Sequence, residues 1–175
     1  MTTSTPVPAL FDEWIQATAP APEQEPAQRC ALAEQKAEQQ RGRVERLKDP
    51  FSPIAEKDPA ALKKEIILWE DDDVMVIVDA FAYGPKALVV PKEKTLFPTD
   101  VDEEMLKRLA VISARVSDAF LQQGANGPAR MWINPPSALT VRQLHVHVQP
   151  GIPRPDDNNA FYASLSAYLQ TKLSS

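Results

Sequence analysis

The chain has few of the residues from which disulfides, metal sites and phosphate loops are built. Its 175 residues include one cysteine, two histidines and five glycines. The lone Cys30 forms no internal disulfide and belongs to no Cys-x-x-Cys pair, which is typical of a reducing compartment. The scattered glycines form neither a glycine-rich phosphate loop nor a Gly-x-Ser-x-Gly turn. These absences exclude a disulfide scaffold, a P-loop enzyme and a hydrolase built on that turn.

A long apolar run and an excess of positive charge are also missing. No segment approaches the roughly 18 consecutive apolar residues that cross a membrane, and residues 1–8 lack the pattern of a signal peptide. The net charge of −5 opposes binding along a nucleic-acid backbone. We therefore expect a cytoplasmic protein without membrane or nucleic-acid partners.

Two regions differ in composition. Residues 1–28 are rich in proline and predict an extended tether. Four apolar residues in this tether lie at helical spacing and predict a short amphipathic helix: Leu10, Phe11, Trp14 and Ile15. Residues 29–175 are long enough for one well-buried domain. Within residues 28–48, the abundance of Ala, Glu, Gln, Lys and Arg predicts a solvated helix.

Apolar runs between turn residues predict five strands. They cover residues 66–70, 74–79, 87–91, 130–134 and 143–149. Short links between the first three predict antiparallel pairing. A last helix should bury Phe161, Leu165 and Leu169. The sequence thus predicts an α+β fold: an antiparallel sheet of about five strands with a long central helix, a C-terminal helix and a helical N-terminal extension.

The long central helix has the clearest periodicity. Its apolar stripe consists of Met105, Leu109, Ile112, Val116 and Phe120. Thr99 or Asp100 is predicted to cap the first turn, because a side-chain oxygen there can accept from a free backbone N–H. Gly124 is predicted to end the helix.

The two histidines lie two residues apart in the fifth predicted strand. In a strand, Gln143, His145, His147 and Gln149 share one face, whereas the aliphatic residues between them face the opposite way. The aliphatic row predicts core and the polar row a candidate site. A zinc site needs at least a third protein ligand, and the chain offers no further histidine, so we expect no metal. The remaining chemistry makes one imidazole a nucleophile.

These residues resemble a known family. The run from Thr140 to Pro150 is similar to the active-site strand of the histidine triad (HIT-like) superfamily, His-φ-His-φ-His-φ-φ, where φ is apolar and proline usually follows. The upstream features of that family occur in the same order: an acidic hairpin at 70–72, Asp79 after a buried strand, Leu-Val-Val-Pro-Lys at 88–92, a long helix, and Asn134 at a strand end. The resemblance covers roughly residues 66–155, about half of the chain.

The resemblance implies a function. In the family, an imidazole nitrogen attacks the α-phosphorus of a nucleotide, and the nucleotidyl-histidine is then resolved by hydrolysis or transfer. It implies Asp79 for the ribose hydroxyls, and Lys86, Asn134 and Thr140 around the phosphate. It further implies a purine mononucleotide conjugate or dinucleoside polyphosphate as substrate, no cofactor, and a homodimer.

Two registers of the triad remain open, and in both one histidine is replaced by glutamine. The gapless match from Thr140 to Pro150 puts Gln143 first, His145 as nucleophile and His147 third. The spacing from Asn134 instead puts His145 first, His147 as nucleophile and Gln149 third. This His-x-His-x-Gln pattern resembles the transferase branch that includes dinucleoside tetraphosphate phosphorylases. We favour the first register because loop lengths vary easily.

Some positions depart from the family pattern. Lys86 stands where many members have histidine, and the phosphate loop keeps only the hydroxyl of Thr140, without the usual glycine. The Cys-x-x-Cys of zinc-bearing members is matched by residues 49–53, which contain no cysteine. Besides an enzyme, the sequence therefore leaves open a nucleotide sensor that does not turn its ligand over, or a structural protein with a packed histidine pair.

Overall fold

The computed structural model describes residues 26–62, 66–79, 82–153 and 155–173. The chain divides into two units, Met1–Gln39 and Gln40–Ser175. The described part of the first unit belongs to helix α2 (Pro26–Val44) and is exposed from residue 30 onward. This helix confirms the one expected over residues 28–48 and ends at Val44. The helix predicted around Trp14 lies outside the described residues, and the domain boundary at residue 28 stays a prediction.

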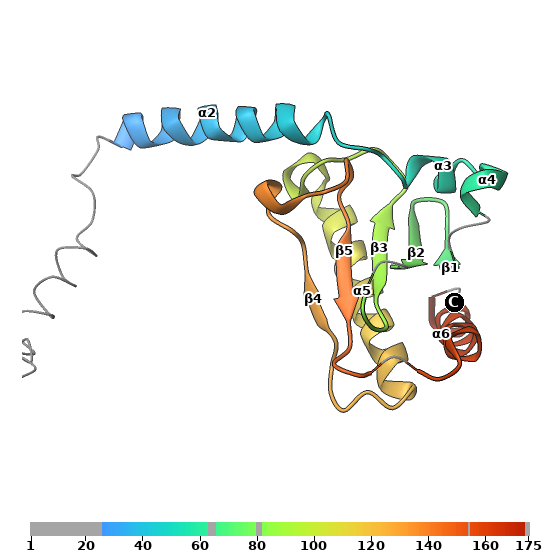
Figure 1. Ribbon diagram of the computed structural model, residues 1–175. Coiled ribbons are helices and arrows are strands. Elements are labelled where there is room, and N and C mark those ends of the chain that lie inside the picture. Colours follow the sequence, from blue (N-terminus) through green and yellow to red (C-terminus); the bar gives the residue numbers. More distant parts are fainter. Residues whose placement is uncertain (1–25, 63–65, 80–81, 154, 174–175) are drawn as a thin grey trace, which may run out of the picture. The chain divides into compact units, whose positions relative to one another are not determined.

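The second unit contains a five-stranded sheet and most of the helices (Figure 1). Its strands are β1 (Ile67–Glu70), β2 (Val74–Val78), β3 (Ala87–Pro91), β4 (Arg130–Trp132) and β5 (Val146–Gln149). Its helices, after the end of α2, are α3 (Ser52–Ala55), α4 (Pro59–Leu62), α5 (Glu103–Gln122) and α6 (Asn158–Leu173), with 3-10 turns η1 (Pro98–Asp100) and η2 (Pro136–Ala138). The predicted α+β fold is confirmed.

All strand pairs are antiparallel, in the spatial order β1-β2-β3-β5-β4. The crossover from β3 to β4 through α5 leaves room for β5 between them, so β5 is a central strand. His147 therefore lies opposite Leu88 on β3 and opposite Trp132 on β4. This register surrounds the second histidine with side chains from both neighbouring strands.

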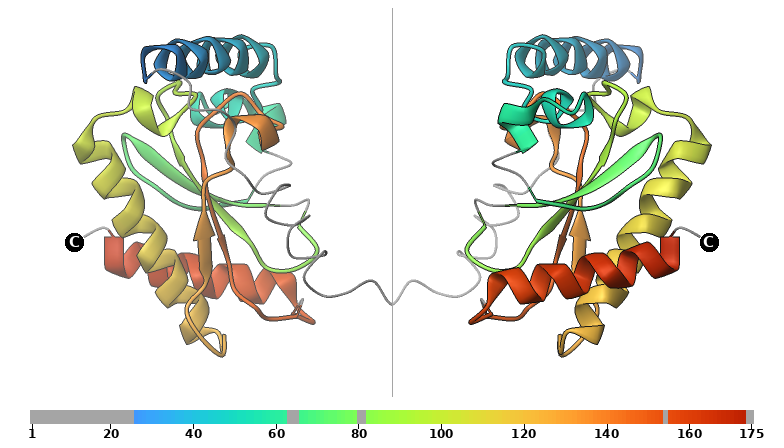
Figure 2. Two further views of the ribbon diagram at one scale, coloured as in Figure 1. Left: turned by 90° about the vertical axis from the view of Figure 1, so that its left-hand side faces the viewer. Right: turned by 90° about the vertical axis from the view of Figure 1, so that its right-hand side faces the viewer.

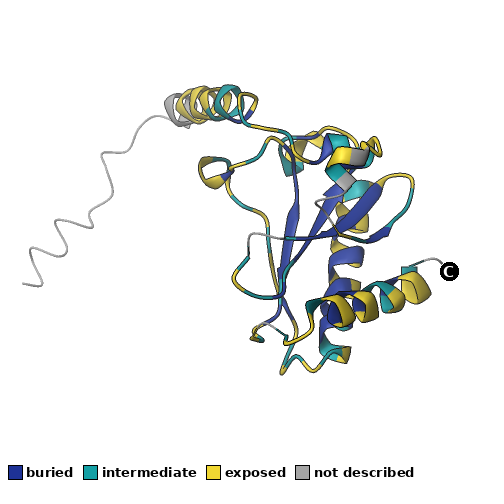
Figure 3. Cartoon of the chain, turned by 45° about the vertical axis from the view of Figure 1, so that its right-hand side comes forward, coloured by how far each residue is buried: buried dark blue, intermediate teal, exposed yellow. Residues whose placement is uncertain are grey.

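The sheet has two covered faces. Alternate residues of β2, β3 and β5 pack against α5 and α6 in the main core, and α6 also lies along β1 (Figures 1 and 2). The residues between them, such as Ile77 and Leu88, point to the other face of the sheet and pack with Phe51 and Ile54 around α3. β2, β3 and β5 are almost wholly buried, whereas much of β4 and the outer sides of α5 and α6 are exposed (Figure 3). The histidines lie on the α3 side of the sheet.

Strand ends and one helix cap differ from the prediction. The fourth strand ends at Trp132 and not at residue 134. The fifth strand begins at Val146 and not at residue 143, because the N–H of Leu144 donates to Thr95 O (2.7 Å) and not to β3. The cap predicted at Thr99 or Asp100 is also wrong. Asp100 instead accepts from the backbone N–H groups of Leu96 and Phe97, just before the η1 turn, while Asp102 caps α5 by accepting from Met105 N at 2.7 Å.

The buried faces of the long helices agree with their periodicity. In α5 the stripe is buried except for Met105, which is partly exposed, and α6 buries its three predicted residues. No helix among the described residues has both the length and the apolar character to cross a membrane.

Candidate active site

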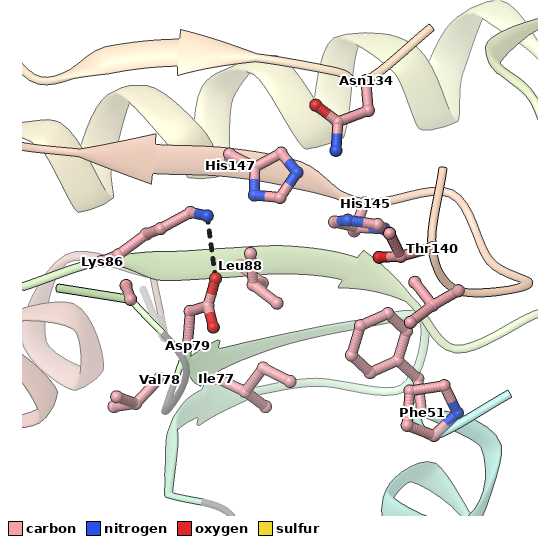
Figure 4. A pocket seen from close by; sticks show the side chains of 13 residues that line it. Phe51, Ile77, Val78, Asp79, Lys86, Leu88, Asn134, Thr140, His145 and His147 are labelled. Carbon is pink, nitrogen blue, oxygen red and sulfur yellow. Dashed lines mark ion pairs between the residues drawn. The ribbon is translucent and has the colours of Figure 1, made fainter. Parts of the chain in front are cut away.

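A cavity of about 500 Å³ opens on the face of the sheet that carries the histidines (Figure 4). Six of the eight predicted site residues line it: Asp79, Lys86, Asn134, Thr140, His145 and His147. Its remaining wall is mostly apolar: Pro50, Phe51, Ile77, Val78, Ala82, Leu88 and Val141. The cavity thus combines an apolar wall with a few convergent polar groups, which is the usual composition of a small-molecule site.

The ring of His145 is fixed by its surroundings. Its Nδ1 lies 2.8 Å from the backbone oxygen of Gln143, and the edge of Phe51 packs on it with ring centroids 5.4 Å apart. Since a carbonyl oxygen only accepts, Nδ1 carries the proton and Nε2 of the neutral ring keeps its lone pair. Burial lowers the pKa of His145, and the bond to Gln143 and the nearby Asp79 offset this only in part. The ring is therefore neutral at physiological pH.

His147 is held by ring contacts. Its ring is stacked on Trp132, with centroids 4.7 Å apart and an interplanar angle of 16°, and lies 4.6 Å from the His145 ring. Neither of its nitrogens has a hydrogen-bond partner within the described part of the chain. Burial, then His145 and Lys86, lowers the pKa of His147 to about 4. His147 is thus an uncharged imidazole whose two nitrogens are buried and without a hydrogen-bond partner among the described groups.

An ion pair stands beside the histidines. Lys86 Nζ lies 2.8 Å from Asp79 Oδ2, and each side chain is only 14% exposed (Figure 4). The same ammonium lies 5.2 Å from the centroid of the Trp132 ring, within cation–π range. A carboxylate offers about four acceptor positions, so Asp79 can bind a hydroxyl while it is paired with Lys86.

Asn134 and Thr140 flank the loop that leads into β5. The indole N–H of Trp132 donates to Asn134 Oδ1 at 3.0 Å and so fixes the amide at the end of β4. Thr140 follows the η2 turn and lies close to His145 in the cavity (Figure 4). These two side chains therefore approach the histidine pair from opposite ends of one loop.

The two glutamines are outside the cavity lining. Gln143 is completely buried, and its Nε2 donates to the backbone oxygens of Pro91 (2.5 Å) and Glu93 (3.5 Å). It ties the loop before β5 to the end of β3. Gln149 lies opposite Arg130 in the sheet, beyond His147.

The structure adds two side chains that the sequence analysis did not identify. Phe51 and Trp132 contact one histidine each. Trp132 could have been predicted from the sequence, because the alternation that puts Asn134 at the site puts Trp132 on the same face of the strand. Phe51 had no such signal, since its position depends on α3 folding over the sheet from outside the motif.

Solved structures that are similar to this chain include histidine triad proteins. A zinc-bound histidine triad family protein from Mycobacterium smegmatis is 27% identical, with a TM-score of 0.59 over 72% of this chain and 96% of that chain. A hypothetical histidine triad nucleotide-binding protein from Sulfolobus tokodaii is 21% identical, with a TM-score of 0.53 over 71% and 91%. No curated protein matches the chain.

The described residues of this chain do not form a zinc site. Over the described ranges, no group of three or more His, Cys, Asp or Glu side chains is placed to hold a metal ion. At the position compared with the family's Cys-x-x-Cys, Asp49 accepts from the N–H groups of Phe51 and Ser52 and from Ser52 Oγ at 2.7 Å. Hydrogen bonds of this carboxylate hold the turn into α3.

The family of the chain follows from a match between its sequence and a family model. The model of the HIT domain matches residues 61–154, more than half of the chain. The matched segment contains the sheet, α5 and both histidines. The chain belongs to the HIT domain family.

Proposed function

We propose that the chain is a nucleotide-binding hydrolase or nucleotidyltransferase that acts at the α-phosphate through a nucleotidyl-His145 intermediate. The observation that carries this proposal is the fixed orientation of His145, with Nδ1 bonded to Gln143 O and the ring in the cavity wall. The low pKa of the ring supports it, because only a neutral imidazole has a lone pair for attack.

The reaction has two displacements at one phosphorus. First, Nε2 of His145 bonds to the α-phosphorus, and the bond to the leaving group breaks with its electron pair on the departing atom. A water or acceptor hydroxyl then attacks the same phosphorus and gives up its proton to solvent, and the N–P bond breaks with its electron pair returning to Nε2, which restores the neutral imidazole. His147, whose nitrogens lack protein partners among the described residues, offers a hydrogen bond to the departing atom.

The cavity suits a nucleoside monophosphate group. Phe51, Ile77 and Leu88 provide an apolar wall for the base, and Asp79 accepts from the ribose hydroxyls. Lys86 places a cation beside the reacting phosphate. We propose a purine mononucleotide conjugate or a dinucleoside polyphosphate as the substrate class.

The geometry favours the first register of the triad over the second. The second register needs His147 as an oriented nucleophile with Gln149 beside it. Its ring lacks a hydrogen bond that would select one tautomer, whereas the cavity lining does not separate the registers because it includes neither glutamine. His145 has the hydrogen bond that this role requires.

Single substitutions of the two histidines test the proposal. We expect His145→Ala to abolish both turnover and adduct formation, whereas His147→Ala still forms the adduct, but more slowly, because the departing atom loses its hydrogen bond. The measurement is intact mass after rapid mixing with dinucleoside polyphosphates or nucleoside phosphoramidates, kept above neutral pH because the N–P bond is acid-labile. Peptide mapping locates the adduct. An adduct on His147, or turnover retained by His145→Ala, contradicts the assignment.

A nucleotide sensor is the second candidate, and the position of Gln143 favours it. That side chain takes the first place of the triad yet bonds to the backbone of Pro91 and Glu93. Calorimetric binding of a dinucleoside polyphosphate with no product after long incubation would select the sensor.

We also propose that the protein forms a homodimer through β4 and α5. β4 is one of the two edge strands of the sheet, and Met131 and Ile133 expose apolar side chains next to Leu106 of α5. These line a shallow groove of about 330 Å³ that also contains Ser113, whose buried Oγ has no hydrogen-bond partner among the described groups. An open edge with an apolar flank is suited to pairing with the same edge of a second copy.

Sedimentation velocity tests the dimer. Met131→Lys should give the monomer mass, because a charge on the edge strand opposes edge-to-edge pairing. Ile66→Lys is the matched control, since Ile66 is similarly exposed (46% against 48%) but lies beside β1 at the other edge. A monomeric wild type, or equal masses for wild type and Met131→Lys, contradicts the proposal.

A further inference from the structure

The loop between β4 and β5 is held from outside the segment that matches the HIT domain. Arg43, at the end of α2, donates from Nη1 to Pro136 O at 2.8 Å and from Nη2 to Leu139 O at 3.3 Å. Further along, the N–H of Arg142 donates to Lys48 O at 2.7 Å. The segment around Arg43 and Lys48 therefore fixes the loop at three points along its backbone.

This loop has little regular structure of its own. It contains two prolines and no glycine between Asn134 and His145, and its only internal structure is the short η2 turn. The turn has two backbone bonds of its own, from Ala138 N to Pro135 O at 2.8 Å and from Leu139 N to Pro136 O at 3.5 Å. A charged guanidinium bonded to two carbonyl oxygens is a stronger restraint, because its planar fork fixes the direction of both.

The restraint also sets the direction of the neighbouring amides. In a trans peptide the C=O and the following N–H point to opposite sides. Arg43 draws the oxygens of Pro136 and Leu139 toward itself, so the N–H groups of Ser137 and Thr140 point away from it. The second of these residues lines the cavity beside His145.

We propose that Arg43 is a positioning residue for the phosphate-binding loop. It holds the peptide planes before Ser137 and Thr140 in the orientation that receives the nucleotide phosphate, in place of the glycine that this loop lacks. This inference rests on the proposed function. By this inference, a residue that precedes the segment matching the HIT domain helps to shape the candidate site.

Arg41 provides a matched control. It lies on the same helix two residues earlier and also makes a two-pronged contact, with Asp100 oxygens at 2.6 and 3.2 Å, and lies over the Phe97 ring. Those partners belong to the η1 turn and its flank, and not to the loop. Removing Arg41 therefore takes the same charge from the same helix and leaves the two loop carbonyls bonded.

The experiment measures AMP binding by calorimetry for wild type, Arg43→Ala, Arg43→Lys and Arg41→Ala. We expect Arg43→Ala to raise the Kd about tenfold, since hydrogen bonds to charged groups are the stronger class. The Kd of Arg41→Ala should stay within about twofold of the wild-type value. The Kd of Arg43→Lys should lie between those of the wild type and Arg43→Ala, because an ammonium lacks the planar fork that bonds both carbonyl oxygens. Millimolar methylguanidinium should restore binding to Arg43→Ala, which a general loss of folding would not allow.

The outcomes separate this inference from the proposed function. If the wild type binds AMP and Arg43→Ala binds it equally well, the positioning role is wrong and the proposed function stands. Equal losses in Arg41→Ala and Arg43→Ala, without rescue, also overturn the positioning role. If the wild type binds no nucleotide, both proposals fail together.

Discussion

The neutral state of His147 makes the stability of the fold depend on pH. Its pKa is about 4 in the folded protein, against 6.5 for an ordinary histidine. Between these values the unfolded chain binds a proton that the folded chain does not, so the free energy of unfolding falls as the pH is lowered. Integrated from about pH 7.5 to about pH 4.5, the loss from His147 alone is about 2.5 kcal/mol. Burial lowers the pKa of His145 as well, which adds a loss of the same sign.

The comparison with His147→Gln isolates this contribution. Carboxylates titrate in both proteins and cancel when the two pH profiles are subtracted. Urea unfolding at about pH 7.5 and about pH 4.5 should show a loss of stability that is smaller in His147→Gln by about 2.5 kcal/mol.

Direct titration provides a second measurement. The chain has two histidines, so its NMR spectrum contains two imidazole Cε1–H signals, and each single variant assigns one of them. The signal of His147 should move with a midpoint near pH 4. A midpoint close to 6.5, together with equal pH dependence of unfolding in wild type and His147→Gln, would refute the reasoning.

Three further predictions concern neighbouring contacts. Lys86→Gln should raise the pKa of His147, because a cation that disfavours the imidazolium is removed; the NMR titration measures it, and an unchanged midpoint contradicts it. Trp132→Phe keeps a ring against His147 but loses the bond to Asn134, so kcat/KM should fall about fivefold, as expected for a hydrogen bond of about 1 kcal/mol; an undiminished kcat/KM argues against a role for that bond. Leu165→Ala should lower the free energy of unfolding by about 3 kcal/mol in urea titrations, since the side chain is fully buried in the main core. A loss below about 1 kcal/mol would contradict this and mean that the core around residue 165 repacks.

The fold was predictable where local signals and packing agree. The strand at Ala87–Pro91 is as predicted, and the buried residues of α6 follow from their spacing. Strand alternation placed His145 and His147 on the face opposite the aliphatic core residues.

The errors arose where a tertiary contact competes with the local pattern. The backbone at Leu144 bonds to Thr95 and leaves the strand short, although the alternation continues through it. The cap moved to Asp102 because Asp100 is used by the η1 turn. Arg43 could not be connected with the site from sequence, since 93 residues separate it from Pro136.

The stack of Trp132 on His147 gives this site an optical signal of its own. An imidazolium quenches the fluorescence of an indole in contact with it, whereas a neutral imidazole quenches weakly. Because the ring centroids are 4.7 Å apart, protonation of His147, or a ligand that draws its ring away, changes the emission of Trp132. Of the other two tryptophans in the chain, Trp69 is buried in the main core, away from the cavity lining. Events at the histidine pair can therefore be followed in real time in the unlabelled protein.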